Sequence, residues 1–233
     1  YRATVSALAV GQLFSWAILY YGFSSFVLPM TAELGWSKAL VMGALTLGLT
    51  VWGAATYAAG AAIDRGHGRA LMTLGSLVAA AGVALWALAR EPWQLFAAWA
   101  LIGAAMAATL YEPAFNVLTK RYPTRYQHGI TTLTLVAGFA STLSFPAAAG
   151  LIEALGWRGA LGAMAALLAF GVAPLHAWAL RGPALVAAPL GADQEAATAT
   201  LHEALRTRAF WLLTLCFTLY SFVIAAFWAH VMP

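Results

Sequence analysis

The stretch AAGAAIDRGHGRAL, residues 58–71, gathers four ionisable side chains into six positions: Asp64, Arg65, His67 and Arg69. This concentration is unusual, because only 9% of the 233 residues are charged and 63% are hydrophobic. Glycines are interspersed with the charges at three positions: Gly60, Gly66 and Gly68. We expect Gly66 and Gly68 to permit positive φ in a tight turn, and Gly60 to let a neighbouring helix approach. The stretch therefore predicts a charged turn between two apolar helices.

The sequence on both sides of this turn consists of long intervals without Asp, Glu, Lys or Arg. There are seven: Ala3–Ala32, Ala39–Ile63, Ala70–Ala89, Pro92–Tyr111, Tyr126–Ile152, Gly159–Leu180 and Ala209–Pro233. Each has about 20 residues or more, enough to cross a hydrocarbon core of roughly 30 Å as a helix, and the fourth continues to Thr119. Runs of this length exclude barrel strands of about ten residues. The sequence predicts an all-α, polytopic helical membrane protein with seven transmembrane helices.

The charges between the spans predict an orientation. If the spans alternate in direction, one side carries nine basic residues and the other only three: Lys38, Arg90 and Arg158. The positive-inside rule places the first side, with the N-terminus, in the cytoplasm of an inner-membrane protein. The net charge of +4 then follows from topology, so nucleic acid is not an expected partner. Two turns on the other side nearly repeat each other, LGWSKAL at 34–40 and LGWRGAL at 155–161.

The intervals also predict a domain organisation. Residues 1–180 form a six-helix bundle, residues 181–208 a cytoplasmic linker, and residues 209–233 the first helix of a second bundle. A stripe of apolar residues in the linker predicts a short amphipathic helix: Ala197, Leu201, Ala204 and Leu205. Because the chain opens with Tyr1 and stops where its seventh span ends, we expect a fragment that lacks the rest of the second bundle.

The charged turn carries a family resemblance. Gly60-Ala-Ala-Ile-Asp64-Arg65-Gly-His-Gly68-Arg69, placed after the second span, resembles the cytoplasmic signature of the major facilitator superfamily. The resemblance implies the major facilitator fold, with seven of an expected twelve helices present. It also implies that Asp64, Arg65 and Arg69 hold two six-helix bundles together and release them during transport, with Gly60 and Gly68 as packing and turn positions. The alternative is an ordinary charged turn.

Asp64 itself needs compensation, because an anion is unfavourable at a helix C-terminus. We expect this from Arg65, from Arg69 or from the N-terminus of another helix.

Three further segments are similar to the monocarboxylate and oxalate/formate branch of that superfamily: ELGWSKA, KRYPTRYQHGI and HVMP. The implied function is secondary active transport of a small solute by alternating access, coupled to protons, with a monocarboxylate or other small organic anion as substrate. A drug or metabolite efflux antiporter is the alternative. Two differences from the drug-exporter pattern weaken this alternative. Trp99 stands where drug exporters carry Arg, and Pro146 follows Phe145 rather than Gly.

Glu112, in TLYEPAFN, is the only formally charged residue within a predicted span. A carboxylate at that depth should be protonated, paired or facing water. Thr109, Glu112 and Asn116 fall on one helical stripe, and Pro113 removes a backbone hydrogen bond beside them. We expect Glu112 to carry a proton or contact substrate, and the alternative is a structural carboxyl group.

Polar and aromatic residues elsewhere in the spans are further cavity candidates. In the first span, one helical face holds Gln12, Ser15, Trp16, Tyr20 and Phe23, and faces either a cavity or a helix interface. The family lines its central cavity with helices one, four and seven, which makes candidates of Gln12, Trp16, Tyr20, Asn116, Thr218 and Tyr220. His230 matches a position where the carboxylate-transporting branch often has His, which implies a coupling or gating role. Thr218 has the alternative of bonding its own backbone. His176 is expected at the membrane interface.

No catalytic residue, metal or cofactor is expected. The spans offer one Glu, two His and the lone Cys216, without ligand-like spacing. A membrane-embedded enzyme or a non-transporting scaffold forms the rival class of function. A non-transporting scaffold would give the charged turn no role.

Overall fold

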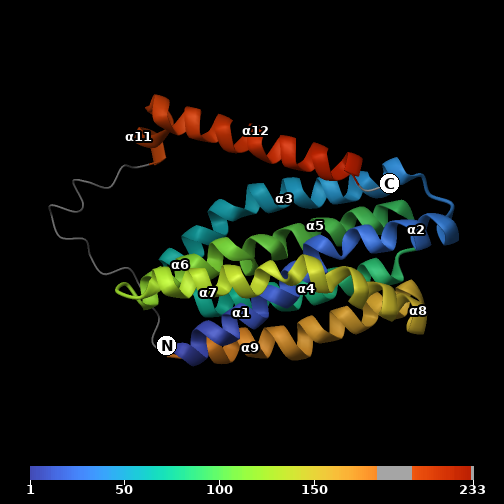
Figure 1. The fold of residues 1–233 in the computed structure, drawn as a ribbon, viewed down its shortest axis with the longest axis horizontal. Coiled ribbons are helices and arrows are strands. Elements are labelled where there is room, and N and C mark those ends of the chain that lie inside the picture. Colours follow the sequence, from blue (N-terminus) through green and yellow to red (C-terminus); the bar gives the residue numbers. More distant parts are fainter. Residues whose placement is uncertain (183–200, 232–233) are drawn as a thin grey trace. The chain divides into compact units, whose positions relative to one another are not determined.

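The computed structural model describes residues 1–182 and 201–231, and every element in these ranges is helical. The chain divides into two compact units, Tyr1–Ala187 and Ala188–Pro233. The predicted all-α membrane fold is therefore confirmed for the part of the chain described (Figure 1).

The first unit contains five stretches that are long and apolar enough to cross a membrane: Arg2–Leu34, Lys38–Asp64, Gly68–Leu88, Pro92–Arg121 and Tyr126–Ala179. The last has 54 residues and turns back at Gly156, so the unit makes six passes. Figure 1 shows this return, from α8 back through α9 towards the N-terminus.

Four of the six passes are interrupted helices. The first is α1 (Arg2–Trp16), a π-helical turn η1 (Ala17–Tyr21) and α2 (Phe23–Leu34). The second and third are α3 (Lys38–Asp64) and α4 (Gly68–Leu88). The fourth is α5 (Pro92–Thr109) with α6 (Tyr111–Arg121). The last two comprise α7 (Tyr126–Gly138), α8 (Ala140–Leu167), η2 (Leu168–Val172) and α9 (Ala173–Ala179).

The second unit contains α11 (Leu201–Arg206) and α12 (Arg208–Val231). Its 24-residue helix α12 coincides with the seventh predicted span. Most of the predicted linker, residues 183–200, lies outside the described residues.

The two LGW segments form the same kind of turn, in which a glycine reverses the chain. Gly35 ends α2 with φ 68°, and Gly156 reverses the chain with the same φ of 68°. Only glycine adopts this left-handed conformation without strain, so each glycine stops one pass and starts the next. Both turns lie at one end of the first unit, here named the Glu33 end. The charged turn lies at the opposite end, here named the Asp64 end.

Small residues bring the helices of the first unit together. A Cβ atom built at Gly103 of α5 would lie 2.1 Å from the carbonyl oxygen of Gly48 in α3. Such backbone contact replaces the hydrophobic effect as the driving force for helix association in lipid. Next to it, Trp99 is fully buried and packs edge-on against Phe23 and Trp86, with ring centroids 4.7 and 5.2 Å away. Trp99 is therefore a core residue.

Candidate functional site

The charged turn joins the end of α3 to the start of α4. Gly66 provides the one positive φ of this turn, 87°, whereas Gly68 has none and begins α4 instead. Asp64 forms an ion pair with Lys120 of α6, with Nζ 2.6 Å from Oδ1. Lys120, rather than Arg65, Arg69 or a helix N-terminus, thus compensates the carboxylate. The sequence carries no signal for this partner, because Asp64 and Lys120 are 56 positions apart in the chain.

Two arginines at the Asp64 end bind carbonyl groups in α9 and just beyond its end. Arg69 donates through Nε to the carbonyl oxygen of Ala177, at 2.9 Å. Arg121 donates to the carbonyl oxygens of Ala179 and Arg181. Carbonyls in the last turn of a helix lack helical donors, and a cation there is favourable. These contacts join α4 and α6 to α9 within the first unit.

The two glycines of the signature differ in their surroundings. A Cβ atom at Gly68 would lie 2.7 Å from Cγ2 of Val117 in α6, so a side chain here displaces α6. At Gly60, no atom of the described residues lies within 4 Å of such a Cβ. Gly68 is therefore a packing position inside the first unit. The role of Gly60, Asp64, Arg65 and Arg69 towards a second bundle stays a prediction.

The fourth pass breaks at Leu110, whose φ of −78° and ψ of −156° are not helical. Pro113 explains the break, since its ring excludes the carbonyl of Thr109 and its nitrogen has no hydrogen to donate. Gln12 of α1 supplies the missing donor: Nε2 lies 2.6 Å from the carbonyl oxygen of Thr109 and 3.2 Å from that of Leu110. Gln12 is fully buried. Gln12 therefore lies at a helix interface and not in a cavity.

The break also changes the position of Glu112. It lies exposed in the first turn of α6, where the positive end of the helix dipole favours a carboxylate. Thr109 is buried, and its hydroxyl bonds to the carbonyl of Ala105 at 2.7 Å. The predicted stripe of Thr109, Glu112 and Asn116 is therefore wrong, because the break rotates one half of the pass against the other. Asn116 is half-buried, one turn beyond Glu112.

An aromatic face lies beside both helix irregularities. It is defined by six side chains, all exposed or half-buried: Trp16, Tyr20, Tyr21, Trp52, Tyr111 and Phe115. Trp16 is its centre, with ring centroids 5.4 Å from Tyr20, 5.9 Å from Trp52 and 4.8 Å from Tyr111. Tyr111 stacks on Phe115 at 5.1 Å. Trp16 and Tyr20 thus lie together, as expected from their shared helical face.

Four members of the aromatic face were missed by sequence reasoning: Tyr21, Trp52, Tyr111 and Phe115. The i, i+4 spacing of Tyr111 and Phe115 was a usable signal. The π-helical turn was not predictable, although the hydrogen bond from the Gly22 nitrogen to the Ala17 oxygen, at 2.8 Å, now defines it. Glu112 follows Tyr111 of the aromatic face directly in the chain.

His176 was expected at the interface, and this prediction is wrong. Its side chain is fully buried, and Nδ1 lies 2.9 Å from the hydroxyl of Ser76 in α4. Gly11 of α1 makes the space, since a Cβ there would lie 2.6 Å from Nε2 of His176. Packing of three passes, which local sequence does not encode, places His176 inside.

The remaining candidates belong to the second unit. The hydroxyl of Thr218 donates to the carbonyl of Thr214 in its own helix, at 2.7 Å, as its alternative required. Tyr220 is exposed on α12. The side chain of His230 lies outside the described residues.

Comparison with known proteins identifies the family. A family model described as Major Facilitator Superfamily matches residues 8–233. The chain is similar to the Multidrug resistance protein MdtH of Yersinia enterocolitica, with 36% identity over 97 residues. It is also similar to MdtH of Yersinia pestis and of Yersinia pseudotuberculosis, with 35% identity over 97 residues. These matches cover 42% of this chain and only 24% of each relative. Because the family model spans nearly the whole sequence, the chain belongs to the Major Facilitator Superfamily.

Proposed function

We propose that the whole protein is a secondary active transporter that exchanges protons for small organic compounds by alternating access. Superfamily membership and the six-pass first unit support the transport mechanism. We propose the inner membrane as its location, with the Asp64 end in the cytoplasm, because most basic residues gather at that end. A second helical bundle of the transporter is the proposed partner of the charged turn.

The aromatic face carries the proposal about substrate. The aromatic face has six exposed or half-buried rings, with Trp16 at its centre, and Glu112 follows Tyr111 directly in the chain. In the passes of the first unit, the described residues include no Arg or Lys between the two charged ends. Such a surface favours aromatic and positively charged compounds over organic anions. The name of MdtH, a multidrug resistance protein, points in the same direction.

Glu112 supplies a physical route to coupling. A carboxylate in the first turn of α6 is stabilised by the helix dipole and remains accessible, because its side chain is exposed. When a proton binds, the surface loses the negative charge of Glu112, and an organic cation loses its counter-ion. Proton and cation therefore compete for one carboxylate. Competition of this kind produces exchange rather than co-transport.

The test is transport by the full-length protein in proteoliposomes, with ethidium as an aromatic cation and lactate as a small organic anion. A proton gradient should drive ethidium movement in the direction opposite to the protons. Glu112→Gln should abolish this drive, whereas Glu153→Gln, which changes an exposed carboxylate of α8, should not. Trp16→Ala should weaken ethidium affinity by about three- to tenfold, and Trp178→Ala should not.

A monocarboxylate carrier is the second candidate, favoured by the segments ELGWSKA and HVMP. It predicts the opposite result. Proton-driven accumulation of lactate without ethidium movement would overturn the cation proposal and leave transport itself intact. If Glu112→Gln and the parent protein respond equally to the gradient, Glu112 is not the coupling residue.

A further inference from the structure

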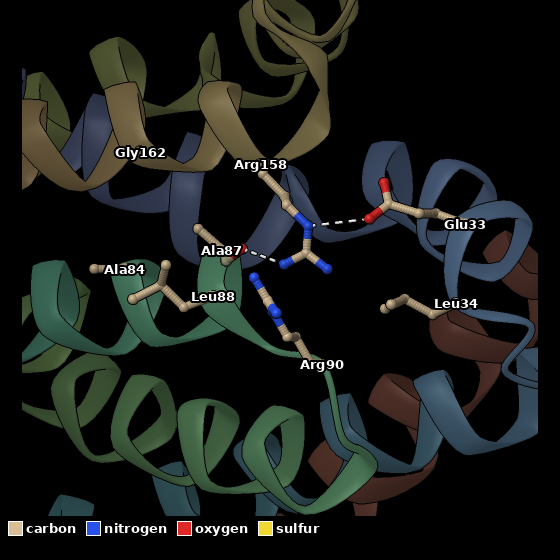
Figure 2. A pocket seen from close by; sticks show the side chains of 8 residues that line it. All are labelled: Glu33, Leu34, Ala84, Ala87, Leu88, Arg90, Arg158 and Gly162. Carbon is tan, nitrogen blue, oxygen red and sulfur yellow. Dashed lines mark hydrogen bonds and ion pairs between the residues drawn. The ribbon is translucent and has the colours of Figure 1, made fainter.

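A cavity of about 660 Å³ opens at the Glu33 end. Figure 2 shows its walls, which come from the end of α2, the end of α4 and the part of α8 after the Gly156 turn. Its lining residues are Glu33, Leu34, Ala84, Ala87, Leu88, Arg90, Arg158 and Gly162. None of them belongs to the candidate site described above.

Glu33 is the acidic residue that lines this cavity, and both of its carboxylate oxygens accept hydrogen bonds. One carboxylate oxygen of Glu33 accepts from Nε of Arg158 at 3.1 Å, and the other accepts from Nε1 of Trp157 at 2.5 Å. Arg158 also donates to the carbonyl oxygen of Ala87 at 2.6 Å, and its guanidinium stacks over the Trp157 ring at 4.2 Å. Arg158 is thereby held in place, and each carboxylate oxygen of Glu33 already accepts one hydrogen bond.

Arg90 is the unmatched charge. Its guanidinium extends into the cavity towards that of Arg158 (Figure 2), and no described residue accepts a hydrogen bond from it. Its backbone is fixed, because the nitrogen of Arg90 donates to the side-chain oxygen of Gln94 at 2.7 Å. Among the residues that line the cavity, two guanidinium groups face one carboxylate, which leaves a surplus of one positive charge. An anion between them would satisfy both charge and hydrogen-bonding capacity.

The rest of the wall indicates what kind of anion. Leu34, Ala84, Leu88 and Gly162 are apolar, and Leu88 is 71% exposed. They lie at the ends of membrane passes, at the depth where acyl chains meet headgroups. A small inorganic anion leaves this apolar wall uncovered, whereas a lipid covers it with a chain.

We propose that this cavity binds an anionic phospholipid, with the headgroup phosphate between Arg90 and Arg158 and one acyl chain along Leu88 and Gly162. A headgroup without an ammonium group is preferred, since an ammonium would add a third cation. The inference is independent of the transported substrate.

Native mass spectrometry of the full-length protein tests the proposal, with phosphatidylglycerol and phosphatidylcholine of identical acyl chains as probes. The parent protein should retain phosphatidylglycerol in preference to phosphatidylcholine. Arg90→Gln should weaken phosphatidylglycerol binding by about tenfold, the loss expected for one charge-assisted hydrogen bond. Lys38→Gln is the matched control, because Lys38 is exposed at the same end and does not line the cavity.

A second variant tests the acyl-chain part. A Cβ atom at Gly162 has no neighbour within 4 Å, so a side chain can start there, and Gly162→Leu should narrow the groove while keeping both arginines. It should also weaken phosphatidylglycerol binding. If Gly162→Leu has no effect and millimolar inorganic phosphate displaces the lipid, the cavity binds a free anion and the lipid proposal fails. An equal loss in Lys38→Gln and Arg90→Gln would attribute binding to general charge and also overturn it.

Discussion

The side-chain amide of Gln12 in α1 lies 2.6 Å from the carbonyl oxygen of Thr109, the acceptor that Pro113 deprives of its helical donor. A residue near the start of the chain thus repairs a helix break almost a hundred residues later. The repair holds the broken fourth pass against the first, and so positions Trp16 next to Tyr111. The aromatic face depends on this contact.

Gln12→Leu should destabilise the protein, because a similar volume remains while the buried Thr109 carbonyl loses its donor. The expected cost is about 1–3 kcal/mol, seen as a lower Tm in detergent. Gln127→Leu changes an exposed glutamine of α7 and should leave the Tm unchanged. Equal Tm values for Gln12→Leu and the parent protein would mean that the hydrogen bond contributes nothing.

Gly103→Ala should destabilise the contact between α3 and α5. Its Cβ atom would lie 2.1 Å from the backbone oxygen of Gly48, so the helices must separate. Overpacking of this kind costs about 1–3 kcal/mol or more. Gly138→Ala is the control, because nothing lies within 4 Å of its Cβ. The Tm of both variants should be measured by thermal unfolding. A Tm for Gly103→Ala at or above that of Gly138→Ala would contradict the close approach of α3 and α5.

Substitutions at Gly60 and Gly68, the two glycines of the charged turn, should have different effects on thermal stability and on transport. Gly68→Ala places a methyl group 2.7 Å from Val117 and should lower the Tm, whereas Gly60→Ala meets no described atom and should leave the Tm unchanged or raised. Transport assays on Gly60→Leu then report on a second bundle. Normal transport by that variant would remove Gly60 from the gating motif.

Asp64 and Lys120 should differ in function although they form one ion pair. The Asp64 side chain is 64% exposed, so the pair contributes only about 0–1 kcal/mol, and neither Asp64→Asn nor Lys120→Gln should shift the Tm much. If Asp64 acts on a second bundle, Asp64→Asn should lose most transport while Lys120→Gln keeps it. Equal losses in the two variants would place the function in the ion pair itself.

Much of the fold was predictable, because a segment that crosses lipid must be apolar over its whole length and must satisfy its own backbone hydrogen bonds. Uninterrupted apolar length specifies a crossing, and each glycine of the two LGW turns marks a reversal. These signals are contained in a few consecutive residues. The same holds for the charged turn, whose letters and place after the second span indicated the superfamily. Glu112 also stood out by itself, as the only charge within a span.

Side-chain partners were not predictable in this way. Lys120 pairs with Asp64, Gln12 caps a break in another pass, and His176 is buried beside Ser76; each relation joins residues from different helices. The sequence by itself determined which segments cross the membrane, because backbone hydrogen bonds and apolar length are satisfied within a segment. Only the tertiary structure decided which faces meet, because the π-helical turn, the break at Leu110 and the glycine contacts set the rotation and depth of each helix against its neighbours.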